Sequence, residues 1–149
     1  MKKLSKEQLA RLGRECLSNN INRTARIITR VYDEKTRPHG YRVTQMQTLY
    51  RIAYSEPVSM NALAKNGNME RTTVIRNCNV LKKDGLISIK TGNDRRFRLV
   101  ELTEKGWQVA NRSYLVWLGQ QAELERKIGK EKIGELLALL RSVRKMLGE

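Results

Sequence analysis

The chain has 149 residues and carries a net charge of +15, because 30 Lys and Arg residues outnumber 15 Asp and Glu residues. Its length predicts a single domain, residues 1–149, with a hydrophobic core, and its charge excess favours binding to a polyanion such as a nucleic acid. No segment approaches the roughly 20 apolar residues of a membrane span, and the start of the chain lacks the apolar stretch of an export signal, so we expect a cytoplasmic protein with no membrane partner.

The start of the chain predicts helices followed by a loop. Ser5 and Gln8 have the spacing of a capping box, and an apolar stripe continues from there to about Tyr32. This stripe predicts either one long helix or two abutting helices, with a break near residues 18–20. A proline and a glycine within residues 36–40 predict a loop, because proline cannot continue the helix and glycine permits a turn.

Two shorter helices are predicted next. Thr44 and Gln47 repeat the capping-box spacing and predict a helix that ends near Tyr54. A short extended link follows this helix. Ser59 is then expected to cap a second helix over residues 60–65.

A third helix is expected over residues 70–83, after a turn at residues 66–68. Val74, Cys78 and Leu81 are spaced by four and three residues, which is typical of the buried line of a helix. The polar side chains that this spacing turns away from the core are Arg71, Thr72, Thr73 and Arg76. Arginine can bond guanine bidentately, and threonine offers a hydroxyl and a methyl to base edges. We predict that these residues bind DNA; the alternatives are a solvated helix face or phosphate contacts without sequence information.

Two β-like runs follow, residues 86–90 and 96–102, with turn-forming residues 91–94 between them. A helix–turn–helix followed by a hairpin predicts a winged helix, with Arg95 and Arg96 at the wing. We predict that at least one of these arginines contacts DNA. The alternative is a surface ion pair, which contributes about 0–1 kcal/mol.

The basic charge is concentrated in two parts of the chain. Residues 61–100 carry nine basic and three acidic side chains, residues 1–30 carry eight and two, and residues 101–149 carry nine and seven. The charge therefore peaks at the predicted DNA-reading segment, where Lys90 and Arg98 are weaker candidates for phosphate contact. The alternative is a generally basic surface, as in a ribosomal protein.

Long helices are predicted at the end of the chain. Thr103 is expected to cap a long helix, and a last helix covers about residues 130–147. The apolar stripes of the terminal helices are too long to be buried on so small a body, whereas a second copy would bury them. We therefore expect a mainly α fold with a small β-hairpin wing: a winged helix-turn-helix over residues 42–103, flanked by long dimerisation helices in residues 1–35 and 104–149.

Short motifs are spread in order along residues 22–110. The first is Arg26–Tyr32, and the others are Val43-Thr44-Gln45-Met46-Gln47, Leu63-Ala64, Thr72-Thr73-Val74 with Arg76, Leu81-Lys82-Lys83-Asp84-Gly85-Leu86, Asp94-Arg95-Arg96 and Leu102-Thr103-Glu104-Lys105-Gly106. Each motif alone is weak, but the ordered set is specific. In order and in register, residues 22–110 resemble the MarR family of transcription regulators, and Arg26–Tyr32 fits the first helix of that family.

The resemblance implies a homodimer whose terminal helices interdigitate and whose two winged lobes read a palindromic operator in double-stranded DNA. It makes Asp94 and Arg96 a pair that stabilises the wing turn. It also implies, for many members, a ligand or oxidant that weakens DNA binding. The expected function is a sequence-specific regulator, a repressor, with a small-molecule effector as a further partner. Gly67 and Asn77 replace residues that are commonly apolar in the family, and we expect both to loosen local packing.

The remaining cysteine and aromatic residues have structural interpretations and rival ones. Cys16 lies about two positions before the cysteine with which one branch of the family senses peroxides, and such a slip turns a helical side chain by about 200°. We therefore expect Cys16 to be a buried thiol in the dimer core rather than a sensor, and Cys78 to be a core residue. Trp107, Tyr114 and Trp117 have the spacing of a core or a dimer interface, with an aromatic effector pocket as the alternative.

Catalysis and cofactor binding are not predicted. The sequence contains no nucleophile–base arrangement, phosphate-cradling glycine loop or metal cluster, and its one histidine, His39, cannot make a metal site unaided. We expect no enzyme activity, no cofactor and no bound metal. The alternative function is nonspecific nucleic-acid binding by a winged-helix protein. An adaptor dimer without DNA binding conflicts with the charge peak in residues 61–100.

Overall fold

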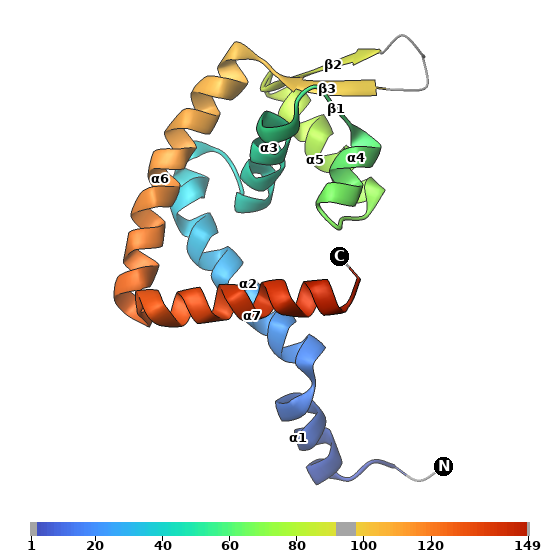
Figure 1. Cartoon of the computed structure of the whole chain (residues 1–149), viewed down its shortest axis with the longest axis vertical. Helices are drawn as coiled ribbons and strands as arrows, with labels where there is room; N and C mark the ends of the chain where they lie inside the picture. Colours follow the sequence, from blue (N-terminus) through green and yellow to red (C-terminus); the bar gives the residue numbers. More distant parts are fainter. Residues whose placement is uncertain (1–2, 92–97, 149) are drawn as a thin grey trace. The chain divides into compact units, whose positions relative to one another are not determined.

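The computed structural model of the protein describes residues 3–91 and 98–148 (Figure 1). They belong to two compact units, residues 1–45 and 46–149. The wing residues that were predicted from the sequence lie outside the described part of the chain; they are Asp94, Arg95 and Arg96. Their contact with DNA stays a prediction, as does the division of the chain into dimerisation helices and a winged region.

Two helices and a short 3-10 helix make up most of the first unit. α1, Lys6–Glu15, begins with the predicted capping box: the Ser5 hydroxyl accepts a hydrogen bond from the Gln8 N–H, and the Gln8 side chain accepts one from the Ser5 N–H. α2 follows as Leu17–Thr36 and leads into η1, Arg37–His39. The segment with the proline and the glycine, predicted as a loop, is therefore partly helical.

The break between α1 and α2 lies at Cys16, earlier than the predicted position at residues 18–20. Cys16 has an extended backbone, with φ −69° and ψ 110°. Asn20 lies inside α2, where its side-chain amide donates to the carbonyl oxygens of Arg14 and Cys16 at 3.0 and 2.9 Å. Because the last carbonyls of a helix have no partner within it, this asparagine caps the end of α1 instead of breaking the helix.

α3, Val43–Ser55, begins one residue before the cap predicted at Thr44. The carboxylate of Asp33, which is 8% exposed, accepts a hydrogen bond of 2.8 Å from the N–H of Val43. A buried carboxylate from the preceding helix therefore satisfies an N–H group at the start of α3. A local capping pattern could not predict this bond, because its partners are ten residues apart.

α4, Met60–Asn66, and α5, Arg71–Lys83, form the predicted helix–turn–helix. As expected, the Ser59 hydroxyl caps α4 by accepting a hydrogen bond of 3.1 Å from the Ala62 N–H. Gly85 follows the end of α5 with φ +72°, a left-handed conformation that glycine adopts at no steric cost. The two helices therefore begin and end close to the predicted residues.

The sheet contains three described strands rather than the predicted two. β2, Ile87–Thr91, and β3, Arg98–Leu102, form the expected antiparallel hairpin, and β1, Val58–Ser59, pairs with the other edge of β3. The strand order is β1-β3-β2, and Val100 of β3 pairs with Val58 on one side and with Ile89 on the other. A two-residue strand carries no alternating pattern, so the sequence did not indicate β1.

α6, Glu104–Ile128, is capped by Thr103 as predicted, since the Thr103 hydroxyl accepts a hydrogen bond of 3.0 Å from the Gly106 N–H. The chain turns at Gly129, with φ +100°, into α7, Lys130–Met146, and Figure 1 shows α7 leaving the end of α6 in a direction that crosses the axis of α6. None of the helices in the described residues combines the length and the apolar character that crossing a membrane requires.

The hydrophobic core of the second unit is built mainly by α3, α4, α5 and the sheet. Its members, each at most 9% exposed, include Met46, Leu49, Ile52, Val58, Leu63, Val74, Cys78, Leu81, Leu86, Ile87, Val100 and Leu102. The three residues predicted to face inward from α5, namely Val74, Cys78 and Leu81, are 1%, 0% and 0% exposed. The predicted mainly α fold with a winged helix-turn-helix is confirmed.

Candidate nucleic-acid interface

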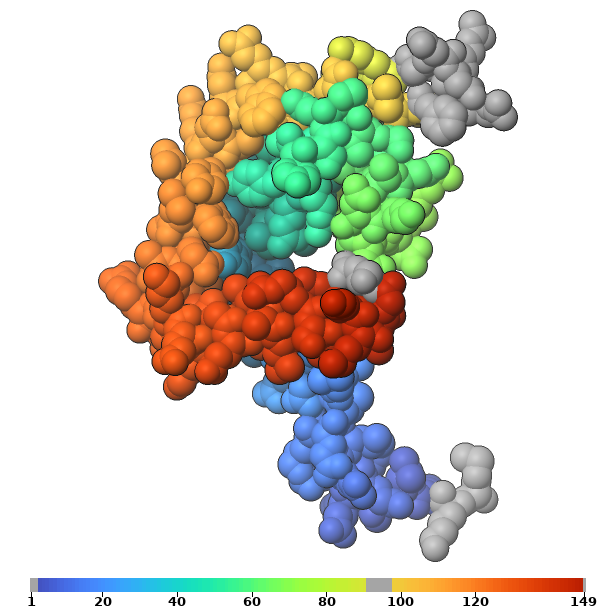
Figure 2. Space-filling view, viewed as in Figure 1, coloured from blue at the N-terminus to red at the C-terminus, as the bar shows by residue number. Residues whose placement is uncertain are grey.

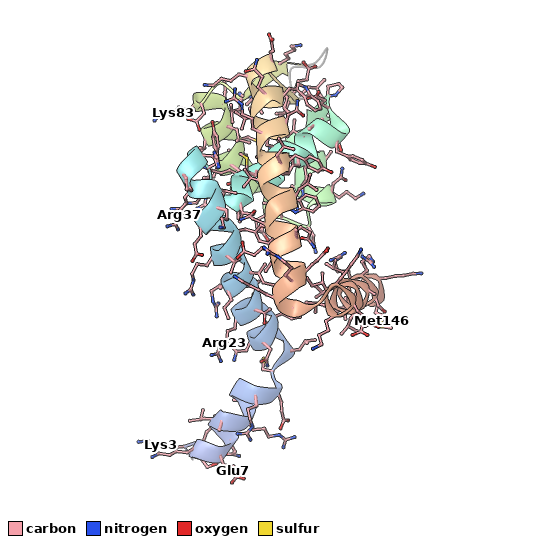
Figure 3. The ribbon with its side chains drawn as sticks, turned by 90° about the vertical axis from the view of Figure 1, so that its left-hand side faces the viewer. Lys3, Glu7, Arg23, Arg37, Lys83 and Met146 are labelled. Carbon is pink, nitrogen blue, oxygen red and sulfur yellow. The ribbon has the colours of Figure 1, made fainter. Side chains whose placement is uncertain are left out.

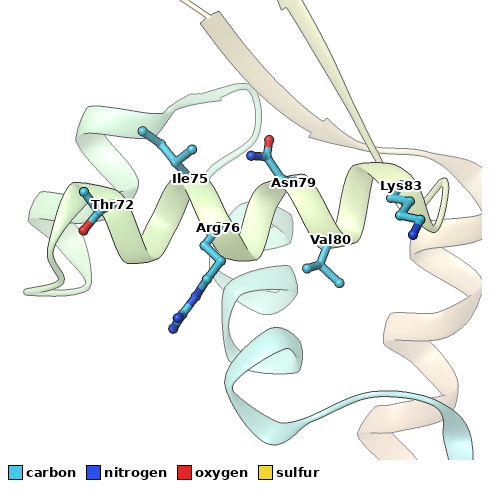
Figure 4. A pocket seen from close by; sticks show the side chains of 6 residues that line it. All are labelled: Thr72, Ile75, Arg76, Asn79, Val80 and Lys83. Carbon is cyan, nitrogen blue, oxygen red and sulfur yellow. The ribbon is translucent and has the colours of Figure 1, made fainter.

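The outward face of α5 lies opposite this buried line. Arg71, Thr72 and Arg76 are exposed, and Thr73 is half-buried. A shallow, open hollow runs along the helix (Figure 4); it is lined by Thr72, Ile75, Arg76, Asn79, Val80 and Lys83. The helix therefore offers solvent a continuous face with polar, cationic and apolar groups.

Helical geometry refines which of the predicted residues share this face. Successive residues turn by about 100°, so Thr72, Arg76, Asn79 and Lys83 fall within a sector of about 60°. Arg71 and Thr73 lie about 100° to either side of Thr72. The four residues predicted from the sequence are therefore two central ones and two flanking ones. Asn79 and Lys83 were missed, although their spacing from Arg76 of three and seven residues was a signal that could have found them.

The turn before α5 is closely packed at Gly67. A Cβ atom added there would lie 3.1 Å from the Leu63 carbonyl oxygen and 3.2 Å from both the Arg51 guanidinium and the Met69 side chain. Arg51 also donates a hydrogen bond of 3.0 Å to the Met69 sulfur. The expectation that Gly67 loosens the packing is wrong, because the space that a side chain would need is already occupied.

Asn77 does not loosen the packing of α5 either. It is 7% exposed, and its side-chain amide donates a hydrogen bond of 3.0 Å to the hydroxyl of Thr48 in α3. A buried polar group costs little when it is hydrogen-bonded. The Asn77–Thr48 bond therefore ties α5 to α3 through a polar contact within the core.

The first turn of α6 is joined to the carbonyl end of α5. The Thr103 hydroxyl donates to the Gly85 carbonyl at 2.7 Å, and the Lys105 ammonium donates to the Asp84 carbonyl at 2.7 Å. A Cβ atom added at Gly106 would overlap the Leu86 carbonyl oxygen, so only glycine permits this close approach. Because the last carbonyls of a helix need partners from outside it, the joint fixes the end of α5 against α6.

The base of the wing is held by side-chain carboxylates. The Glu56 carboxylate accepts hydrogen bonds from the Leu102 N–H at 2.6 Å and from the Trp107 indole at 3.2 Å. Lys90, a weaker candidate for phosphate contact, forms an ion pair with Glu101 at 2.6 Å, with the lysine side chain 66% exposed. Because Glu101 partly neutralises the charge of Lys90, this lysine attracts a polyanion less strongly than an unpaired lysine would.

The two cysteines occupy different environments. Cys78 is fully buried, and burial raises the pKa of its thiol to about 11. It is the core residue that the sequence predicted, and its reactive thiolate form is disfavoured at neutral pH. Cys16 is exposed in the single chain, so its predicted burial in a dimer core stays a prediction.

The aromatic residues of α6 do not belong to the core. Trp107, Tyr114 and Trp117 are 42%, 52% and 38% exposed, and the rings of the last two stack with their centroids 5.6 Å apart. Of the two structural interpretations, burial in the core of the chain is wrong, and the dimer interface stays a prediction. Within residues 3–91 and 98–148, no group of three His, Cys, Asp or Glu side chains is placed to hold a metal ion.

Comparisons with known proteins agree with this geometry. Residues 39–96 match the sequence model of the MarR family. YwoH of Bacillus subtilis (strain 168), an uncharacterized HTH-type transcriptional regulator, is 30% identical over 89 residues, which are 60% of this chain and 65% of the length of that relative. The chain therefore spans slightly less than two thirds of the length of this curated relative.

Two solved structures illustrate the likeness. The transcriptional regulator MosR of M. tuberculosis, crystallised in complex with DNA, is 33% identical with a TM-score of 0.76, over 91% of this chain and 100% of that chain. A mutant of E. coli MarR, crystallised with operator DNA, is 21% identical with a TM-score of 0.79, over 89% and 96% of the two chains, and shares the fold. The family match within the helix–turn–helix and the likeness to MosR over nearly the whole chain show that this protein belongs to the MarR family.

Proposed function

We propose that the protein is a sequence-specific, double-stranded DNA-binding transcription regulator, a repressor that acts as a homodimer on a palindromic operator in the cytoplasm. The outward face of α5 carries the proposal. Thr72 and Arg76 at its centre are exposed opposite a fully buried line, as a helix that enters the major groove requires. The net charge of +15 supports a polyanionic partner, and MosR, which was crystallised with DNA, supports DNA as that partner.

The homodimer is supported by the terminal helices. Among the described residues, neither α1 nor α7 contains a buried one, although both carry apolar side chains at helical spacing. The exposed large apolar residues of α1, α2, α6 and α7 include Leu9, Leu12, Leu17, Tyr114, Leu115, Trp117, Leu118, Leu136, Leu137 and Leu139. Figure 2 shows α7 open to solvent along its length on one face. Large exposed apolar surfaces mark interaction sites, and a second copy of the chain would cover them.

A dimer of this kind places two α5 helices in successive major grooves, with half-sites about 34 Å apart along the DNA. We assign base contact within each half-site to Thr72 and Arg76, and contact at its edges to Arg71 and Thr73. Arg95 and Arg96 of the wing would reach the backbone or the minor groove. The repressor sign and a small-molecule effector rest on the family resemblance.

Selection of bound sequences from random duplex DNA, followed by competition, tests the proposal. We expect the purified protein to select one palindromic motif and to hold it against a large excess of random duplex at physiological salt, because specific binding is typically about 10³–10⁷ times tighter than nonspecific binding. Equal competition by random duplex would contradict the proposal and would favour a nonspecific nucleic-acid-binding winged helix instead.

A further inference from the structure

The outward face of α5 has two edges of different chemistry. Ile75 and Asn79, four residues apart, project on one side of the helix, and Arg76 and Val80 project on the other (Figure 4). Asn79 is exposed, and among the described residues its amide has no hydrogen-bond partner. The edge formed by Ile75 and Asn79 therefore presents a donor, an acceptor and a branched apolar side chain to whatever occupies the hollow.

We infer that the Ile75–Asn79 edge reads A·T base pairs, and that Asn79 determines specificity for adenine. This inference rests on the proposed function and goes beyond it by naming the base. An asparagine amide pairs one donor with one acceptor, and the adenine edge in the major groove presents the complementary N7 acceptor and N6 donor. Guanine presents two acceptors there, N7 and O6, so the amide oxygen would face an acceptor instead of a donor. The apolar Ile75 suits the thymine methyl group.

The length of the face supports this assignment. Thr72 and Asn79 are seven residues apart, which is about 10.5 Å along a helix, and the major groove is about 12 Å wide. Lys83 lies a further 6 Å or so along the helix, and Figure 3 shows its side chain projecting outward from the end of α5. Asn79 thus falls within reach of base edges, while Lys83 falls at the phosphate backbone.

Asn77 shows why the same residue type two positions away cannot take this role. Two residues turn a helical side chain by about 200°, and Asn77 is buried and bonded to Thr48. The Asn77 amide is therefore already hydrogen-bonded within the core. Asn79 has the same chemistry but no hydrogen-bond partner within residues 3–91 and 98–148, so its amide is available to a ligand.

The test compares binding-site selection by the wild type with selection by Asn79→Ala, Asn79→Asp, Lys83→Ala and, as a control outside both the α5 face and the proposed dimer interface, Ser142→Ala on the side of α7 away from Leu136 and Leu137. We expect Asn79→Ala to lose roughly 5- to 150-fold discrimination for adenine at one position of each half-site, with the other positions unchanged. Asn79→Asp should change that preference toward cytosine, because a carboxylate accepts from the cytosine amino group. Lys83→Ala should weaken all sequences alike, and Ser142→Ala should match the wild type.

A second measurement isolates the thymine methyl group. The selected site is resynthesised with deoxyuridine in place of thymidine at the position next to the adenine that Asn79 reads, and both duplexes are titrated. The wild type should lose affinity on loss of the methyl group, whereas Ile75→Ala should bind the two duplexes equally.

The outcomes separate this inference from the proposed function. Failure of the wild type to select any motif overturns both. A wild-type motif that Asn79→Ala selects unchanged, or an Asn79→Ala protein that binds every sequence more weakly by the same factor, overturns the inference and leaves the proposed function standing. Unchanged circular dichroism of the variants establishes that lost discrimination does not reflect unfolding.

Discussion

Two regions of the molecule differ in how far their apolar residues are buried within one copy of the chain. We call α3, α4, α5 and the sheet the lobe, and α1 and α7 the terminal arms. In the lobe, Leu49, Ile52 and Leu81 are completely buried within one copy of the chain. In α1 and α7, no described residue is buried, and leucines such as Leu139 are up to 63% exposed. The lobe therefore has what it needs for a stable core, whereas the arms expose surface that a second copy would bury. Substitutions in the two regions should accordingly change different equilibria.

The largest expected effect comes from charging the apolar stripe of α7. Leu136 and Leu137 are 42% and 46% exposed, and replacing both with glutamate would place two charges in the interface of the proposed dimer. We expect the double variant to sediment as a monomer and to lose about 100-fold or more in operator affinity, since two linked lobes bind far more tightly than one.

Ser142→Glu is the matched control, because Ser142 is exposed on the opposite side of α7. It should remain dimeric and bind the operator as the wild type does. A double Leu→Glu variant that still sediments as a dimer would show that α7 does not form the interface.

Truncating the lobe core should act on unfolding instead of association. Leu81 is fully buried in α5, so Leu81→Ala should lower the free energy of unfolding by about 2–5 kcal/mol through lost burial and a residual cavity. Urea unfolding measures this loss, and sedimentation should give a dimer dissociation constant close to that of the wild type. A large change in the dimer dissociation constant would contradict the expectation that the lobe core affects unfolding and not association.

Local patterns in the sequence predicted the lobe well, because its elements are defined by short-range chemistry. Ser59 and Thr103 cap their helices as expected, and the inward line of α5 follows from helical spacing alone. The misses depend on partners distant in the chain. β1 exists only by pairing with β3, and the start of α3 is satisfied by Asp33 from the preceding helix.

The candidate site on α5 was predicted only in part, because neighbours in the sequence were not separated by their positions around the helix. Thr72 and Arg76 were found, but Arg71 and Thr73 were grouped with them as neighbours in sequence, although they flank the central face. Asn79 follows Arg76 at helical spacing and was overlooked. The wing arginines lie outside the described residues, so their part in the site remains a prediction from the sequence.

α6 joins the two regions and allows a comparison of two glycines. A Cβ atom at Gly106 would overlap the Leu86 carbonyl, whereas one at Gly119 meets nothing within 4 Å. We expect Gly106→Ala to lower the free energy of unfolding by about 1–3 kcal/mol, because α6 must shift away from the lobe. Gly119→Ala, the control, should raise it by up to about 1 kcal/mol, since alanine favours a helix. Equal effects of the two substitutions on thermal unfolding would contradict the close packing of Gly106 against the Leu86 carbonyl.

The smallest effect is expected at Cys78, and only in alkali. Burial raises the pKa of this thiol from 9.0 to about 11, so its contribution to stability is complete below pH 9.0. As the pH rises toward about 11, the unfolded thiol ionises while the folded one stays protonated, and stability falls. Near pH 10 the loss should be about 1 kcal/mol. The Cys78→Ala variant has no thiol to ionise and should not show this loss. The stability of the variant relative to the wild type should therefore rise with pH.

Leu81→Ala is the control, because it truncates the same buried line of α5 but keeps the Cys78 thiol. Its stability relative to the wild type should not change with pH in this range. Tyr32 and Tyr50, whose pKa values are also raised by burial, titrate alike in wild type and variant and therefore cancel in the difference. A difference between Cys78→Ala and the wild type that stays constant from neutral pH to about pH 10 would mean that the thiol is less sheltered than the packing of α5 requires. Such a result would also weaken the contrast between a self-sufficient lobe and open arms, because that contrast depends on a lobe core closed to water in a single copy.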